Sequence, residues 1–168
     1  MAEAIPMQDL EEELSERFPV SVIMQRTELD NRWASESWEA IGVTVGTSSL
    51  RDNNNQPKKI FQQANISQYL LTDFEIVLHA DECESYYHNL MSLSPRCFII
   101  ADLNEEEMPI PFLVSLSQDE AHSYLEGDEE VYAIDLPAEL YLWSESFVLS
   151  HYAPSKKIKR KLKNWKKE

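Results

Sequence analysis

Glycine is scarce in this sequence. The 168 residues include three glycines, Gly42, Gly46 and Gly127. Loops that bind nucleotide phosphates need glycines at fixed offsets, because only then can the backbone approach the phosphate closely. None of the three glycines fits such a spacing, so the P-loop and the dinucleotide-binding fingerprint are both absent. The sequence therefore argues against a nucleotide-dependent enzyme of the usual folds.

Cysteine and long apolar runs are also lacking. Cys83 and Cys97 are too few for a disulfide framework, and we expect both as small buried hydrophobic residues. The beginning of the chain has no basic region followed by an apolar stretch, as a secretory signal would have. No apolar run approaches the roughly 18–20 residues of a membrane-spanning helix. We therefore expect a cytoplasmic protein.

Motifs for metal binding and catalysis are missing as well. His79, Cys83, His88 and Cys97 are the best candidates for zinc, which imidazole and thiolate groups bind well. However, Cys83 and His88 would lie on different sides of a helix, and no paired-ligand spacing is present. There is no nucleophile elbow, and the serines that neighbour histidines lack a third orienting group. We predict no metal, no cofactor and no catalytic residue.

Charge is divided unevenly along the chain. The formal net charge is −15, yet residues 156–168 carry eight basic side chains against one acidic side chain. The first 155 residues therefore hold 7 basic and 29 acidic side chains. A body this negative would repel phosphate backbones, so we do not expect it to bind nucleic acid.

Hydrophobic periodicity predicts the regular elements. Period-two alternation and short apolar runs indicate a strand from Phe18 onward. Further strands are expected at Trp38–Val45, Lys59–Ala64, Gln68–Leu71, Phe74–His79, Arg96–Leu103, Phe112–Leu116 and Glu130–Leu136. Helical spacing appears at Asp81–Leu93, and a longer helix follows Pro137 and ends at Tyr152, before Pro154. Residues 118–127 form a helix or a loop.

These elements define the expected fold class, which is α+β. We predict a mostly antiparallel sheet or half-barrel of six to seven short strands with two packed helices, the longer one near the C-terminus. An acidic arm (1–16) precedes this single domain (17–153), and a basic tail (154–168) follows it.

The basic tail is a candidate for partner binding. Its apolar residues Ile158, Leu162 and Trp165 recur at i, i+4 and i+7, so a helical tail would show a narrow apolar stripe among cations. Such a segment suits an acidic protein surface, or peripheral contact with a membrane. The alternative is a frayed, solubilising terminus. The cations are Lys156, Lys157, Lys159, Arg160, Lys161, Lys163, Lys166 and Lys167.

Two further groups of residues are candidate contact sites. Trp33 and Trp38 stand among charged residues in a polar segment, where they either contact a partner or simply cover the core. Glu82, Tyr86 and Asn89 would share one helix face and could bind a polar ligand, as an enzyme or small-ligand protein would. Alternatively, that face hydrogen-bonds to a neighbouring strand or loop.

Four stretches of the chain resemble a bacterial family called domain of unknown function 3305. They are Arg17–Val43, Leu78–Leu90, Pro95–Leu103 and the closing helix with its tail. In the second stretch the pattern similar to the family's is Leu78, His79, Glu82, Tyr86, Asn89 and Leu90.

The resemblance implies a context rather than a mechanism. No catalytic residues are established for the family, and similar proteins are often encoded beside molybdenum-dependent formate dehydrogenases. From this context we expect a non-enzymatic accessory protein that helps to assemble, stabilise or localise such an enzyme through a protein partner.

Overall fold

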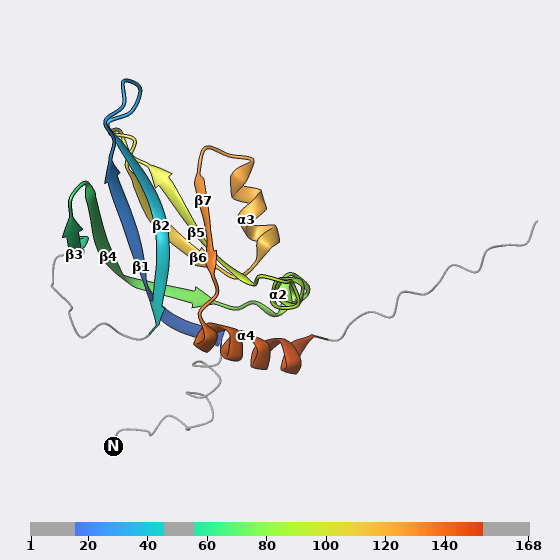
Figure 1. Ribbon diagram of the computed structural model, residues 1–168. Coiled ribbons are helices and arrows are strands. Elements are labelled where there is room, and N and C mark those ends of the chain that lie inside the picture. Colours follow the sequence, from blue (N-terminus) through green and yellow to red (C-terminus); the bar gives the residue numbers. More distant parts are fainter. Residues whose placement is uncertain (1–15, 46–55, 153–168) are drawn as a thin grey trace, which may run out of the picture.

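The computed structural model describes residues 16–45 and 56–152, which form two antiparallel sheets and three α-helices (Figure 1). The predicted α+β class is confirmed, with strands dominating and the longest helix nearest the C-terminus. Residues 1–15, 46–55 and 153–168, which include the expected basic tail and nearly all of the expected acidic arm, lie outside the described residues.

The first sheet has the strand order β2-β1-β4-β3. Its members are β1 (Arg17–Glu28), β2 (Glu36–Val45), β3 (Lys58–Gln63) and β4 (Ile66–Val77). Strand β1 turns Val20, Val22 and Met24 into the core, although the alternation is interrupted where the β1–β4 register shifts between Val20 and Val22. One face of the sheet is therefore apolar and has to be covered.

The second sheet has the order β6-β5-β7, formed by β6 (Pro109–Ser115), β5 (Arg96–Leu103) and β7 (Glu130–Asp135). Strand β5 is buried on both faces: Cys97 and Ile99 join the main core, whereas Phe98 and Ile100 pack on the other side with Ala121 of α3 (Gln118–Leu125). This double burial explains why the strand reads as an unbroken apolar run.

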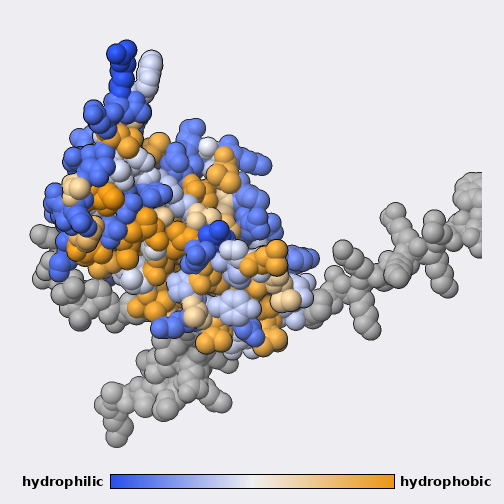
Figure 2. Space-filling view, in the orientation of Figure 1, coloured by the Kyte–Doolittle hydropathy of each residue, from blue (hydrophilic) through white to orange (hydrophobic). Residues whose placement is uncertain are grey.

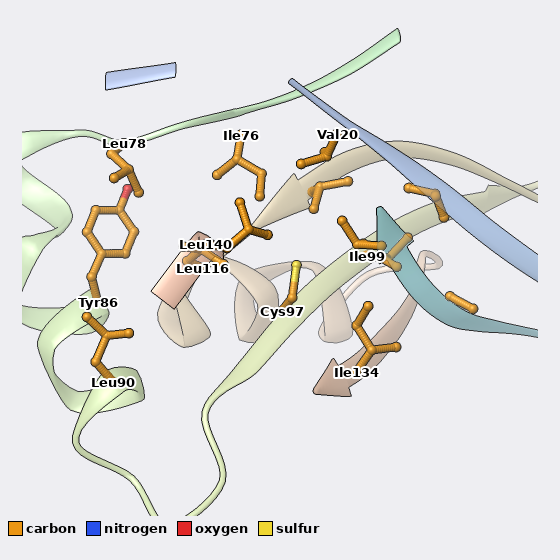
Figure 3. Close-up of a cluster of buried hydrophobic side chains, with 14 of the residues drawn as sticks. Val20, Ile76, Leu78, Tyr86, Leu90, Cys97, Ile99, Leu116, Ile134 and Leu140 are labelled. Atoms are coloured by element: carbon orange, nitrogen blue, oxygen red, sulfur yellow. The ribbon is translucent and has the colours of Figure 1, made fainter. Parts of the chain in front are cut away.

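The two sheets face each other, with β2 beside β7 and β4 beside β6. At one end of the molecule the η1 turn (Ala80–Glu82) leads into α2 (Cys83–Leu90), which packs beside α4 (Ala138–His151) (Figure 1). The main core fills the space between sheets and helices, and Figure 3 shows Cys97 and Tyr86 directed into it with Leu140 and Leu116. The expectation that Cys83 and Cys97 are buried is confirmed.

One strand is longer than the sequence suggests. The separate strands expected at Gln68–Leu71 and Phe74–His79 form the single strand β4. The register irregularity opposite β1 falls between Leu71 and Phe74, and Asp73 has φ 69° there. The bulge breaks the apolar pattern without ending the strand, since bulges insert extra residues into a continuing ladder.

The β3–β4 hairpin contains a strained turn residue. Its two-residue loop places Ala64 at φ 50°, a left-handed conformation that costs an L-residue about 1–2 kcal/mol. Because glycine avoids this cost, we expect Ala64→Gly to raise the free energy of unfolding by about 0.5–1 kcal/mol in chemical denaturation. The control is Gln63→Gly on the adjoining strand, which should destabilise. Equal losses for both variants would contradict a strained turn.

Candidate functional site

The end of the sandwich opposite α2 and α4 is open and contains two adjoining cavities of about 330 and 530 Å³. They share Glu36 and Trp38 from β2 on one side, and Glu106 and Pro109 from the β5–β6 connection and β6 on the other. We call the two cavities together the open groove. It lies near the β1–β2 loop, which projects beyond both sheets (Figure 1).

The smaller cavity is mainly apolar. It is lined by Met24, Tyr69 and Leu71 of the first sheet, and by Met108 and Ile110 of the β5–β6 connection and β6. A flexible methionine wall adapts to irregular apolar shapes. This part of the groove therefore suits an aliphatic side chain.

An ion pair stands at the border of the two cavities. The guanidinium of Arg26 pairs with the carboxylate of Glu36, which also accepts a 3.1 Å hydrogen bond from the indole N–H of Trp38. These two donors lower the pKa of Glu36, and the hydrogen bond to Glu36 raises the pKa of Arg26. Arg26 is thus already neutralised by the chain's own carboxylate.

The larger cavity is acidic and aromatic. Glu106, Glu107 and Glu130 line it together with Trp33 and Tyr132. Burial and the negative charges of Glu130 and Glu39 raise the pKa of Tyr132 to about 12. This part of the groove therefore offers a negative potential with no cation of the described residues paired to those three carboxylates.

The acidic loop of this cavity is held in one conformation. The side-chain oxygen of Asn104 accepts 2.9 Å hydrogen bonds from the backbone N–H groups of Glu106 and Met108. Glu107 adopts φ 59°, in the left-handed region. The acidic run Glu105–Glu107 lies at the end of the β5–β6 hairpin. An asparagine before a short polar run is the turn signal that could have placed them at a hairpin end.

The two tryptophans of the β1–β2 region differ in environment. Trp33 is 89% exposed, in a loop held by the 3.0 Å bond from its backbone N–H to Asn31 and by the backbone bond between Leu29 and Ser35. Trp38 is half-buried, packs on the main core and lies 5.6 Å from the ring of Tyr69. Trp38 therefore covers the core with part of its side chain, as one of the two interpretations from the sequence expected. Trp33 does not cover the core.

The predicted helix face lies at the closed end, and its residues bond to the chain itself. Tyr86 and Asn89 are buried. The Asn89 amide donates to the carbonyls of Arg96 (2.7 Å) and Leu116 (2.9 Å) and accepts from the N–H of Arg96 (2.9 Å). The Tyr86 hydroxyl accepts a 3.1 Å bond from the backbone N–H of His79.

Glu82 belongs to a network of serines beside that face. Its carboxylate accepts a 2.8 Å bond from the hydroxyl of Ser117, which lies 3.0 Å from Ser85 and caps α3 by accepting from the N–H of Glu120. Across the described residues, no buried side-chain nitrogen or oxygen lacks a hydrogen-bond partner. The network thus joins α2 to the start of α3.

The zinc candidates are not brought together. Cys83 and Cys97 lie in the core, where burial raises the pKa of both thiols, whereas His79 and His88 are exposed. Within the described ranges, no three His, Cys, Asp or Glu side chains gather in an arrangement that could hold a metal ion.

A third hollow, of about 660 Å³, lies beside α4 and is bordered by Leu93 and Leu142. With Met91 and Leu149 these residues expose apolar surface at this end of the molecule, as Figure 2 also shows over α4. No helix of the described residues is long and apolar enough to cross a membrane. The predicted contact residues of the basic tail lie outside the described residues.

The fold and the open groove define an α+β protein of two antiparallel sheets with an acidic, aromatic surface at one end. Residues 19–161 match the family model described as "Protein of unknown function (DUF3305)", and the chain belongs to this family. A search of the curated proteins gave no match, and neither did a search of the solved structures.

The bonds of Asn89 predict a structural role. Asn89→Ala removes the partner of one buried backbone carbonyl, that of Leu116, and of two half-buried backbone groups of Arg96, so we expect the free energy of unfolding to fall by about 2–3 kcal/mol. The control is Asn65→Ala, which removes one exposed bond to Glu28 and should cost less than about 1 kcal/mol. Thermal unfolding measures both. An Asn89 variant of unchanged stability would show that the helix face is not needed for the fold.

The ion pair at the groove predicts a pH dependence of stability. The pKa of Glu36 is lower in the folded state than in the unfolded state. Its stabilising contribution is therefore complete above the unfolded-state pKa and is lost as pH falls through the folded-state pKa. We expect Glu36→Gln to be less stable than the parent near neutral pH, and this difference to shrink in acid. Chemical denaturation at a series of pH values measures the stability difference between variant and parent, with Glu39→Gln on the same strand as the control. A difference that does not change with pH would contradict the predicted role of the Glu36 ion pair.

Proposed function

We propose that this protein is a non-enzymatic accessory protein that binds a protein partner through the open groove, including its exposed Trp33. The observation that carries the proposal is the position of Trp33, which is 89% exposed in a loop whose backbone is held by hydrogen bonds. A large aromatic side chain on a preorganised backbone contributes much contact area at little entropic cost. Tryptophan is also among the residues that dominate binding energy at interfaces.

The composition of the groove supports a protein partner over a nucleotide or nucleic acid. Its outer part carries three glutamates, Glu106, Glu107 and Glu130, in a body that is acidic overall. Phosphate groups would be repelled there. A protein partner with a complementary surface would instead gain both the aromatic contact and the electrostatic attraction.

The partner that we propose is a subunit or maturation factor of a molybdenum-dependent formate dehydrogenase. This part rests on the gene context that the family resemblance implies. The accessory protein would assist the assembly, stability or localisation of that enzyme. The basic tail, Lys156–Lys167, would add a second contact with an acidic partner surface or a membrane.

Affinity co-purification from the native host tests the proposal. We expect the full-length protein to capture formate dehydrogenase subunits or a maturation factor. Trp33→Ala should weaken this capture about tenfold or more, because loss of a hot-spot tryptophan costs about 2 kcal/mol or more. The matched control is Leu149→Ala, which truncates another strongly exposed apolar side chain, 77% exposed on α4 and away from the groove.

Two further comparisons complete this experiment. A chain ending at Ser155 should capture less partner at low salt and a similar amount at moderate salt, because the contribution of exposed charges is screened by salt. If no redox-enzyme subunit or maturation factor is captured by any variant at either salt concentration, the accessory role is wrong. If Trp33→Ala and Leu149→Ala capture equal amounts, the groove is not the contact surface.

A further inference from the structure

We propose that the open groove binds an extended peptide segment of its partner in which lysine or arginine stands next to a bulky aliphatic residue. This inference rests on the proposed function and adds the chemistry of the partner. It follows from the two adjoining cavities, which differ in character and share a border at Glu36 and Trp38.

The apolar cavity selects the aliphatic residue. Its space of about 330 Å³ is lined by Met24, Leu71, Met108 and Ile110, and Arg26, the cation that the described residues contribute to this lining, is paired with Glu36. Burying an aliphatic side chain here removes apolar surface from both molecules, and the unpaired carboxylate among the described residues of this lining, Glu106, is shared with the acidic cavity. A polar residue would lose its hydration in this cavity without an equivalent gain.

The acidic cavity selects the cation. Glu106, Glu107 and Glu130 project their charges around a space of about 530 Å³ that also contacts Trp33 and Tyr132. A lysine or arginine side chain there gains attraction from the carboxylates, and its stem or guanidinium packs on the aromatic rings. An acidic segment would meet like charges, so the groove discriminates by repulsion as well as attraction.

Because the two cavities share four lining residues, one peptide segment can reach both of them. In an extended chain successive side chains point to opposite sides about 3.3 Å apart along the backbone. The neighbours of a residue directed into the apolar cavity start on the opposite side, so only a long, flexible side chain such as lysine or arginine can bend back across the shared border to the glutamates. Strand β6 is at the edge of its sheet and contributes Pro109 and Ile110 to the groove lining. An extended segment bound in the groove would therefore lie beside this strand.

Peptide binding to the full-length protein tests the inference. The probe is a fluorescein-labelled peptide with the sequence Lys-Leu-Lys between glycine–serine ends, measured by fluorescence anisotropy. We expect binding that is about tenfold weaker when leucine is replaced by serine. Binding should be lost when both lysines are replaced by glutamate, and it should weaken as salt is raised.

Matched variants place the peptide on the groove. The double variant Glu106→Gln with Glu107→Gln should weaken binding of the Lys-Leu-Lys peptide about fivefold, the effect of losing two partly screened charge pairs. The control is Glu84→Gln with Glu139→Gln, which removes the same charge from α2 and α4 and should change binding less than twofold. Ile110→Lys, a cation on an exposed side chain of the apolar cavity, should abolish binding. Circular dichroism checks that each variant is folded.

The outcomes separate this inference from the proposed function. If the control pair weakens binding as much as the groove pair, the peptide responds only to net charge and the inference is wrong. If the peptide binds the chain ending at Ser155 but not the full-length protein, the chain's own tail is the occupant and the inference is also wrong. If Trp33→Ala weakens partner capture but no Lys-Leu-Lys peptide binds, the accessory role stands and the proposed partner chemistry falls.

Discussion

The burial of β5 on both faces is the constraint on which the rest of the fold depends. Cys97 and Ile99 need the first sheet against them, and Phe98 and Ile100 need α3. Because β5 also pairs with β6 and β7 along its edges, no side of it is left to solvent over most of its length. The other layers are arranged around this strand, since leaving either face uncovered would forfeit about 1.5–3 kcal/mol for each exposed aliphatic side chain.

The two ends of this sandwich are finished in different ways. At the closed end, Asn89 and Ser117 satisfy backbone groups where β5, β6 and the helices meet. At the open end, Glu106, Glu107 and Glu130 lie together without a cation of the described residues paired to them. The polar groups at the closed end therefore stabilise the fold, whereas the three glutamates at the open end repel one another. Because unpaired charges are costly unless they serve binding, this contrast is the reason for placing the proposed binding surface at the open end.

Local patterns predicted most of the elements, but not the environments of their side chains. The apolar run of β5 gave its bounds correctly, and Pro137 marked the start of α4. Helical spacing also placed Glu82, Tyr86 and Asn89 on one helix, yet spacing does not reveal that the segment after β6 would meet that face. The open groove could not be predicted for the same reason. It requires β2 and the β5–β6 loop, about 60 residues apart in the sequence, to lie side by side.

The acidic loop of the groove is arranged against the local preferences of its residues. Glu107 holds a left-handed conformation that glycine would adopt without cost, and it stands next to like charges. Asn104 enforces this geometry with two backbone hydrogen bonds, and the pairing of β5 with β6 fixes both ends of the loop. Such strain persists only where the surrounding structure imposes it, and strained residues cluster at ligand-binding sites. On the proposed binding mode, a cation bound in the groove would relieve the repulsion among the glutamates, and the hydrogen-bonded loop would keep the entropic cost of binding low.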